Sequence, residues 1–277
     1  MTFYVNLRAG AVGGAVVDPY VIEGDGTKVP PALKYVEART LPARVAGKDI
    51  LFGVHGFNVS YGNGASELGW LDNALRLSPP ELFFGVLWPG DFWLPVINYP
   101  FEGATSIDSG RRLAEFCNRW FDQARSISFL SHSLGARLVL EAITNLDRAV
   151  ESVCLTAGAI NHDCLTSEYA LALTKITAVT TLASRNDLVL KLAFPVGDLI
   201  SDVLHADHIP LRRALGYDGP HPLAGPSVTP SQISDAAGYG HGDYLPPPSA
   251  TQPVGGKWPL VADFMACSFR KTRPAWP

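Results

Sequence analysis

The sequence predicts an α/β fold with a mainly parallel central sheet and helices on both faces. Short apolar runs such as Asp49–Val54 alternate along the chain with segments of helical spacing, as in strands that crossover helices bury on both sides. The 277 residues are 47% hydrophobic and 17% charged, which is typical of a compact globular protein. No internal repeat or linker divides the sequence, so we expect a single domain over residues 1–277.

The strands are predicted from alternating or continuous apolar runs. Thr2–Arg8 alternates like a half-buried edge strand, and residues 33–38 are its candidate neighbour across a Gly- and Pro-rich connection. The other expected strands are residues 49–54, 82–88, 127–130, 152–157 and 176–183, with one more short strand near 228–233.

The helices are predicted where apolar side chains recur every three or four residues. Leu113, Phe116, Trp120 and Phe121 form such a stripe in one of them. The expected helices are residues 67–77, 107–124, 134–146, one between the strands 152–157 and 176–183, an amphipathic segment 189–208, and a closing helix 258–269. Residues 89–103 and 220–253 are rich in proline and glycine, so we expect loops there.

The composition also limits the partners and the compartment. A formal net charge of −4 gives no basic field, so nucleic acid is not an expected partner. No stretch reaches the ~20 apolar residues that a membrane span needs, and the N-terminus does not have the pattern of a signal peptide. The four cysteines have no CxxC spacing and are expected to be free thiols. We therefore expect a cytoplasmic protein with no metal and no cofactor.

The candidate chemistry is concentrated in FLSHSLGAR, residues 129–137. A short apolar strand enters, a helix leaves at once, and Ser131 and Gly135 stand two positions on either side of Ser133. A nucleophile at such a tight strand-to-helix turn needs small neighbours, and the turn lifts its hydroxyl above the sheet. The backbone N–H of Leu134, at the helix start, could stabilise an oxyanion there.

Ser131 replaces the first glycine of the G-x-S-x-G motif that is typical of this turn. Small residues also occur at helix starts as N-caps, so the alternative is that Ser133 only caps the helix 134–146. The other motifs of the sequence help to distinguish a nucleophile from a helix cap.

HGFN at residues 55–58, WPG at 88–90, HSLG at 132–135, SRND at 184–187 and GHGD at 240–243 together resemble the alpha/beta-hydrolase superfamily. More narrowly, they resemble a bacterial branch of serine hydrolases of unknown function. The resemblance covers most of the chain, from about Asp49 to Asp243. It implies a Ser–Asp–His triad and no particular substrate.

The resemblance also implies that the loop after the strand Asp49–Val54 supplies the second oxyanion donor. That donor would be the backbone N–H of Phe57, with Gly56 allowing close approach of the substrate. We expect His55 to brace the loop by hydrogen bonding and not to act as a base.

Seven histidines are candidates for the base that a serine nucleophile requires. His241 is favoured because it lies in a glycine-flanked loop, GYGHGDY, which can carry an imidazole over the sheet. The resemblance places the family's base in the same loop. His205 and His208 remain alternatives.

Asp187 is the predicted acid, since it follows the expected strand 176–183 and could orient the imidazole. Asp163 is the alternative acid, and Asp187 could also be no more than the N-cap of a following helix.

The predicted substrate is a small neutral ester, because no basic cluster marks an acidic one. The aromatic side chains that follow the strand 82–88, which either line an apolar pocket or form a hydrophobic plug, are Phe92, Trp93, Tyr99 and Phe101. Residues 190–204 are predicted to form either a partial lid or an ordinary packed helix.

The predicted reaction is ester hydrolysis through an acyl-enzyme. The same triad would also serve an amidase or an acyltransferase, and a non-catalytic binding module of the same fold is the remaining alternative. The oligomeric state is not predicted.

Overall fold

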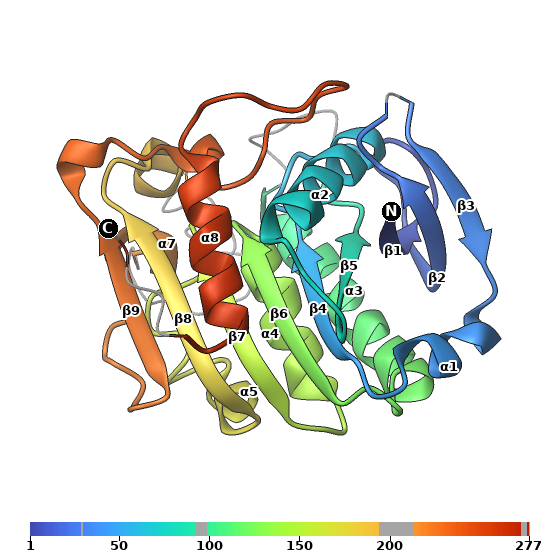
Figure 1. Cartoon of the computed structure of the whole chain (residues 1–277). Coiled ribbons are helices and arrows are strands. Elements are labelled where there is room, and N and C mark those ends of the chain that lie inside the picture. The colour runs from blue at the N-terminus through green and yellow to red at the C-terminus, as the bar shows by residue number, and fades with distance from the viewer. Residues whose placement is uncertain (29, 92–98, 194–212, 273–275, 277) are drawn as a thin grey trace.

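A computed structural model describes residues 1–28, 30–91, 99–193, 213–272 and 276. Its centre is a nine-stranded sheet with the order β3-β2-β1-β5-β4-β6-β7-β8-β9 (Figure 1). The pairs β1–β2 and β2–β3 are antiparallel, and all other pairs are parallel. The strands are β1 Thr2–Arg8, β2 Val16–Asp25, β3 Ala32–Val36, β4 Asp49–Val54, β5 Glu81–Leu87, β6 Ser126–His132, β7 Val150–Thr156, β8 Ile176–Ser184 and β9 Val228–Ile233.

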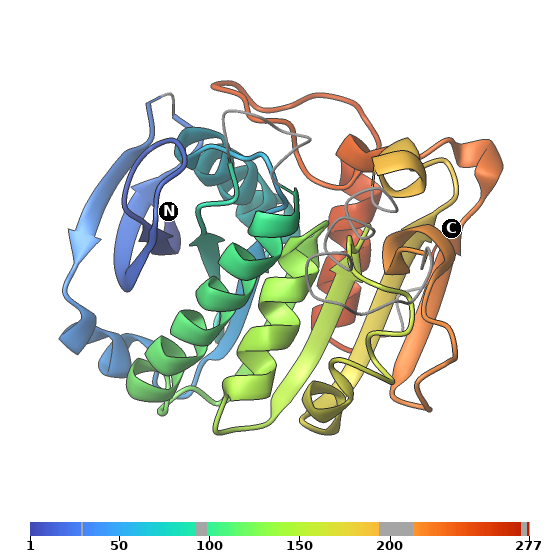
Figure 2. The same cartoon turned by 180° about the vertical axis from the view of Figure 1, so that it is seen from behind.

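Helices cover both faces of this sheet, which confirms the predicted fold class. α2 (Tyr61–Leu75) and α8 (Trp258–Phe269) lie in front of the strands in Figure 1. α3 (Tyr99–Trp120) and α4 (Gly135–Asn145) pack together on the opposite face, which Figure 2 turns toward the viewer. The shorter helices are α1 Leu41–Val45, α5 Ala170–Thr174 and α7 Leu215–Asp218.

Two helices begin earlier than their apolar stripes predicted. α2 starts at Tyr61 because Ser60 caps it, its hydroxyl accepting from the N–H of Asn63 at 3.4 Å. α3 starts at Tyr99, inside the segment that its proline and aromatic content marked as loop. The amphipathic segment predicted at 189–208 begins with a single π-helical turn, Val189–Ala193, and its remainder lies largely outside the described residues.

The predicted pairing at the N-terminal edge of the sheet was wrong. β2 lies between β1 and β3, so β1 is an interior strand that also pairs with β5. The sequence did not predict β2 because the strand contains Pro19, and proline is disfavoured inside strands. Pro19 is tolerated because it lies where the pairing of β1 with β2 is irregular. Asn6 pairs with Tyr20, but Arg8 pairs with Val16. Three residues of β2 thus stand opposite one of β1, a bulge that relieves the missing N–H.

A cluster of aromatic side chains in the core packs the central strands together. Four phenylalanines are buried, and the ring centroids of those in contact lie 5.1–5.7 Å apart: Phe52 of β4, Phe84 of β5, Phe129 of β6, and Phe121, which directly follows α3. Parallel strands held in this way bring their carboxyl ends to one edge, where ligand sites of open α/β sheets form. The segments that follow β4, β6 and β8 start at this edge, and they contain His55, Ser133 and Asp187.

Candidate active site

Ser133 occupies the turn between β6 and α4 in a left-handed backbone conformation, with φ 55°. Three hydrogen bonds hold this backbone. Ser133 N–H donates to the carbonyl of Thr156, and its own carbonyl accepts from the N–H groups of Ala136 and Ala159, all at 3.1 Å. A non-glycine residue with positive φ is costly, and it persists where the surroundings fix it.

Close packing around this turn explains Gly135, two positions after Ser133, and Gly56 in the loop after β4. A Cβ on Gly135 would lie 2.7 Å from the carbonyl oxygen of His55. A Cβ on Gly56 would lie 2.9 Å from both Ser133 Cβ and His132 Nδ1. The two glycines therefore let the loop after β4 pack closely against both the Ser133 turn and the start of α4.

The three predicted triad residues come together at this edge. Ser133 Oγ lies 2.8 Å from His241 Nε2, and His241 Nδ1 lies 2.7 Å from Asp187 Oδ2. The Asp187 side chain is fully buried, whereas that of His241 keeps 19% of its surface exposed. The hydroxyl, the imidazole and the carboxylate thus form one continuous hydrogen-bonded chain, of which the imidazole is the most exposed part.

Asp187 also has the capping contact that was its alternative role. Its Oδ1 accepts from the backbone N–H of Leu190 at 3.0 Å, while Oδ2 contacts His241. One carboxylate therefore starts the following helical turn and orients the imidazole. The alternative acid, Asp163, lies in the turn after β7, where its carbonyl accepts from the N–H groups of Thr166 and Ser167.

The loop of His241 is anchored on both sides. Ser184 Oγ, at the end of β8, donates to the carbonyl of Tyr239 at 2.8 Å. Within the loop, Asp243 Oδ2 accepts from the N–H of Gly240 at 2.8 Å and from Lys257 Nζ at 3.3 Å. Asp243 therefore shapes the loop and does not contact the imidazole through its own carboxylate.

Two buried histidines flank the triad. Burial lowers the pKa of His55 to about 3, and the charge of Arg8 acts in the same direction. Burial likewise lowers the pKa of His132 to about 3. Both imidazoles are neutral near pH 7 and act as hydrogen-bonding groups. His55 contacts its neighbours as predicted: its carbonyl accepts from Trp88 Nε1 at 2.9 Å, and its Nδ1 lies 2.8 Å from the Gly56 carbonyl.

The contact of His132 was not predicted. Its Nε2 lies 2.9 Å from the backbone carbonyl of His241, and the two rings are 4.8 Å apart. The motif marks His132 only as a neighbour of Ser133, so nothing local in the sequence indicates this partner.

The two predicted oxyanion donors belong to the segments next to the Ser133 turn. Leu134 follows Ser133 at the start of α4, where N–H groups have no intrahelical acceptor. Phe57 follows Gly56, where an added Cβ would meet Ser133 Cβ, and the Phe57 side chain packs against the core.

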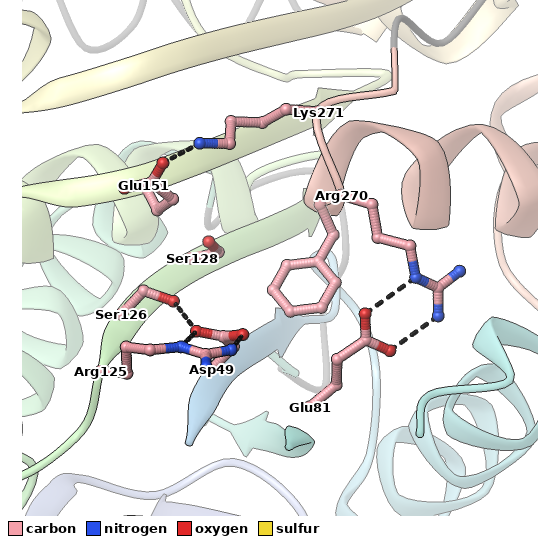
Figure 3. Close-up of a pocket in the computed structure, with 9 residues that line it drawn as sticks. Asp49, Glu81, Arg125, Ser126, Ser128, Glu151, Arg270 and Lys271 are labelled. Carbon is pink, nitrogen blue, oxygen red and sulfur yellow. Dashed lines mark hydrogen bonds and ion pairs between the residues drawn. The ribbon is translucent and has the colours of Figure 1, made fainter. Parts of the chain in front are cut away.

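A pocket of about 440 Å³ lies at the opposite edge of the sheet (Figure 3). Its lining comes from the starts of β4 to β7 and from the end of α8, and its charged groups are paired with one another. The pairs, marked in Figure 3, are Arg125–Asp49, Arg270–Glu81 and Lys271–Glu151. Since the triad lies at the carboxyl ends of the strands, this pocket is separate from it.

Several predicted residues lie outside the described part of the chain. Phe92 and Trp93 do, as do the alternative bases His205 and His208 and most of the candidate lid 190–204. Tyr99 and Phe101 belong to the first turn of α3, but their side chains are not described.

The four cysteines are free, as predicted. Within the described ranges, no group of three or more His, Cys, Asp or Glu side chains is arranged to hold a metal ion. In the same ranges, no helix is long and apolar enough to cross a membrane.

Comparisons with solved structures return esterases. A Pyrobaculum calidifontis esterase is 11% identical, with a TM-score of 0.42 over 83% of this chain and 78% of that one. The esterase PE8 is 14% identical, with a TM-score of 0.44 over 82% and 93%. Esterase B of Lactobacillus rhamnosis is 13% identical, with a TM-score of 0.42 over 87% and 79%.

No curated protein matches the sequence. The family model described as alpha/beta hydrolase of unknown function (DUF900) matches residues 37–254, which include every member of the Ser133–His241–Asp187 chain. The protein therefore belongs to this family of alpha/beta hydrolases.

Proposed function

We propose that the protein is a serine hydrolase that cleaves a neutral carboxylic ester through an acyl-enzyme. The observation that carries the proposal is the hydrogen-bonded chain from Ser133 Oγ through His241 to the buried Asp187, with links of 2.8 and 2.7 Å. A serine hydroxyl is a poor nucleophile until a base accepts its proton. These distances allow that transfer without any rearrangement of the side chains.

In the first half-reaction, Ser133 Oγ attacks the ester carbonyl carbon and its proton passes to His241 Nε2. The carbonyl oxygen becomes an oxyanion, and His241 becomes an imidazolium. Asp187, which contacts Nδ1, stabilises this cation and holds the tautomer with the free electron pair on Nε2. Collapse of the intermediate expels the alcohol, which takes the proton from Nε2. Water repeats the sequence on the acyl-enzyme and releases the acid.

The oxyanion needs donors that already point to the place where the charge develops. We assign this role to the backbone N–H groups of Leu134 and Phe57. Leu134 is supported by its position as the N-cap of α4, whose dipole also favours negative charge. Phe57 is supported by the close approach of Gly56 to Ser133: an added Cβ on Gly56 would lie 2.9 Å from Ser133 Cβ, so the loop passes beside the nucleophile.

The test is the variant Ser133→Ala against short p-nitrophenyl esters. Turnover should fall by about 10⁴-fold or more, the order seen when a triad member is removed, while the thermal midpoint changes little. Ser109→Ala is the matched control, because Ser109 is an equally buried serine in α3, outside the site. Labelling by a fluorophosphonate should occur in the wild type and in Ser109→Ala, but not in Ser133→Ala. Equal turnover in both variants would refute the assignment of the nucleophile.

A product analysis defines the reaction type. In water alone the acid should accumulate in step with the alcohol. Preferred formation of new esters or amides, when small alcohols or amines are added, would identify an acyltransferase.

A further inference from the structure

Arg8 ends β1 and has a guanidinium that is completely buried. All five of its N–H donors have acceptors. Nε donates to the carbonyl of Gly10 at 3.2 Å, and Nη1 donates to the carbonyls of Val59 and Trp88 at 3.0 and 2.8 Å. Nη2 donates to the carbonyl of Ala11 at 3.2 Å and to Asp91 Oδ1. One side chain therefore ties three separate segments together.

Two of these segments are the 55–59 loop, which follows β4, and residues 88–91, which follow β5. They are also joined directly. Trp88 Nε1 donates to the carbonyl of His55 at 2.9 Å, and Asn58 N–H donates to the carbonyl of Gly90 at 2.6 Å. Asn58 has φ 59°, so the loop turns in a left-handed conformation that these contacts must hold.

Arg8 adds a further link between these two segments: through its hydrogen bond to the Val59 carbonyl, it holds the last residue of the 55–59 loop. Arg8 lies where β1 and β2 lose their regular pairing, between Asn6 and Arg8. Bulges of this kind are frequent beside active sites. Asp91 supplies the compensating charge and accepts a second hydrogen bond, from Gly13 N–H at 3.2 Å. The buried ion pair is thus neutral overall, and its other donors go to backbone carbonyls.

We infer that Arg8 is a positioning residue of the active site, acting through Val59 and Trp88 to fix the loop that presents the Phe57 N–H to the oxyanion. The inference rests on the proposed function. It also gives a catalytic task to the N-terminal strands β1 and β2, which precede the segment matched by the family model.

The discriminating variant is Arg8→Lys. Lysine keeps the charge that Asp91 needs, but its three donors radiate from one nitrogen and cannot reach five acceptors. The 55–59 loop should lose its contacts at Val59 or Trp88. We expect kcat on a p-nitrophenyl ester to fall by about 10²-fold, the order that follows from a 1 Å displacement or from the loss of one oxyanion donor. KM and the acid limb of the pH profile, which reports the base, should stay unchanged.

Asp91→Asn separates this role from simple support of the fold. Asparagine Oδ1 can still accept from Arg8 and Gly13, so the loop contacts persist while the buried charge loses its partner. The thermal midpoint should fall, whereas kcat, measured well below that midpoint, should stay within about threefold. Arg44→Lys is the matched control: Arg44 pairs with Glu23 of β2 at 2.6 Å and lies outside the frame around the loop.

Four outcomes decide the matter. A loss of kcat in Arg8→Lys alone supports the inference. Full kcat in a folded Arg8→Lys, with an active wild type, overturns it and leaves the proposed function intact. Losses of kcat that follow the thermal midpoint across all three variants overturn it in favour of a purely structural role. The labelling rate of Ser133 by a fluorophosphonate gives the same comparison of the variants without an ester. A wild type that neither labels nor turns over esters would refute the proposed function and this inference together.

Discussion

His132 donates a hydrogen bond from Nε2 to the backbone carbonyl of His241, 2.9 Å away and 109 residues later in the chain. The carbonyl can only accept, so the proton of the neutral imidazole is on Nε2. His132, next to Ser133, thus holds the main chain of His241, and the Ser133–His241 distance depends on more than the two side chains that define it.

Replacement of His132 by phenylalanine should preserve the packing against His241 and Tyr244 but remove the donor. We expect kcat to fall by roughly 10- to 100-fold, since loss of fixed geometry at this distance is costly, with KM nearly unchanged. His132→Gln, which can donate from its amide, should recover part of the loss. Steady-state kinetics on a p-nitrophenyl ester measure both. A phenylalanine variant with wild-type kcat would show that the hydrogen bond plays no part in positioning the base.

Asp187→Asn separates the two contacts of Asp187. Asparagine can still accept from the N–H of Leu190 and so keep the cap, but it provides no charge for the imidazolium and favours the wrong tautomer. We expect kcat to fall by about 10³- to 10⁴-fold with little change in the thermal midpoint. A large loss of stability with substantial residual activity would mean that Asp187 serves only as the cap.

Gly56→Ala tests the close approach of the 55–59 loop to the nucleophile. The added methyl would lie 2.9 Å from Ser133 Cβ, so the loop or the turn must shift. A displacement of this kind should reduce kcat by about 10²-fold. Gly62→Ala, six residues later in α2, is the control because a Cβ there meets no atom within 4 Å. If both variants retain wild-type kcat, the site tolerates a looser oxyanion loop than proposed here.

Glu67 gives a prediction for the pH dependence of stability. This partly buried residue of α2 has a carboxyl whose pKa burial raises to about 8. Between its unfolded pKa near 4.5 and about 8, the folded protein binds more protons at this site than the unfolded chain does. Glu67 therefore makes folding less favourable as the pH rises through this window.

The variant Glu67→Gln removes the ionisation. We expect it to be more stable than the wild type at pH 9, by roughly 1–2 kcal/mol after allowance for its partial exposure, and nearly equal at pH 5. Denaturant unfolding at the two pH values measures the difference. A gain of equal size at both would point to packing instead of the carboxyl charge.

Much of the fold follows from local signals. Apolar runs marked β4 to β8, because parallel strands buried on both faces read as continuous hydrophobic segments. The turn of Ser133 was recognisable because small residues flank a serine between an apolar strand and a helix. β2 was missed because Pro19 argues against a strand, and only the bulge opposite Leu7 makes room for it.

By itself, the sequence determined the α/β class and the strand-to-helix turn that carries Ser133. Both are properties of neighbouring residues, which local propensity and spacing encode. The assignment of Asp187 and His241 as the partners of Ser133 came from the resemblance to the alpha/beta-hydrolase superfamily. The tertiary structure decided which carboxylate contacts His241, how His132 reaches its carbonyl, and that Arg8 of β1 meets Asp91 after β5. These contacts join residues 54 to 109 positions apart. They depend on strand order, on a bulge and on loops packed at one edge of the sheet, none of which a local pattern specifies.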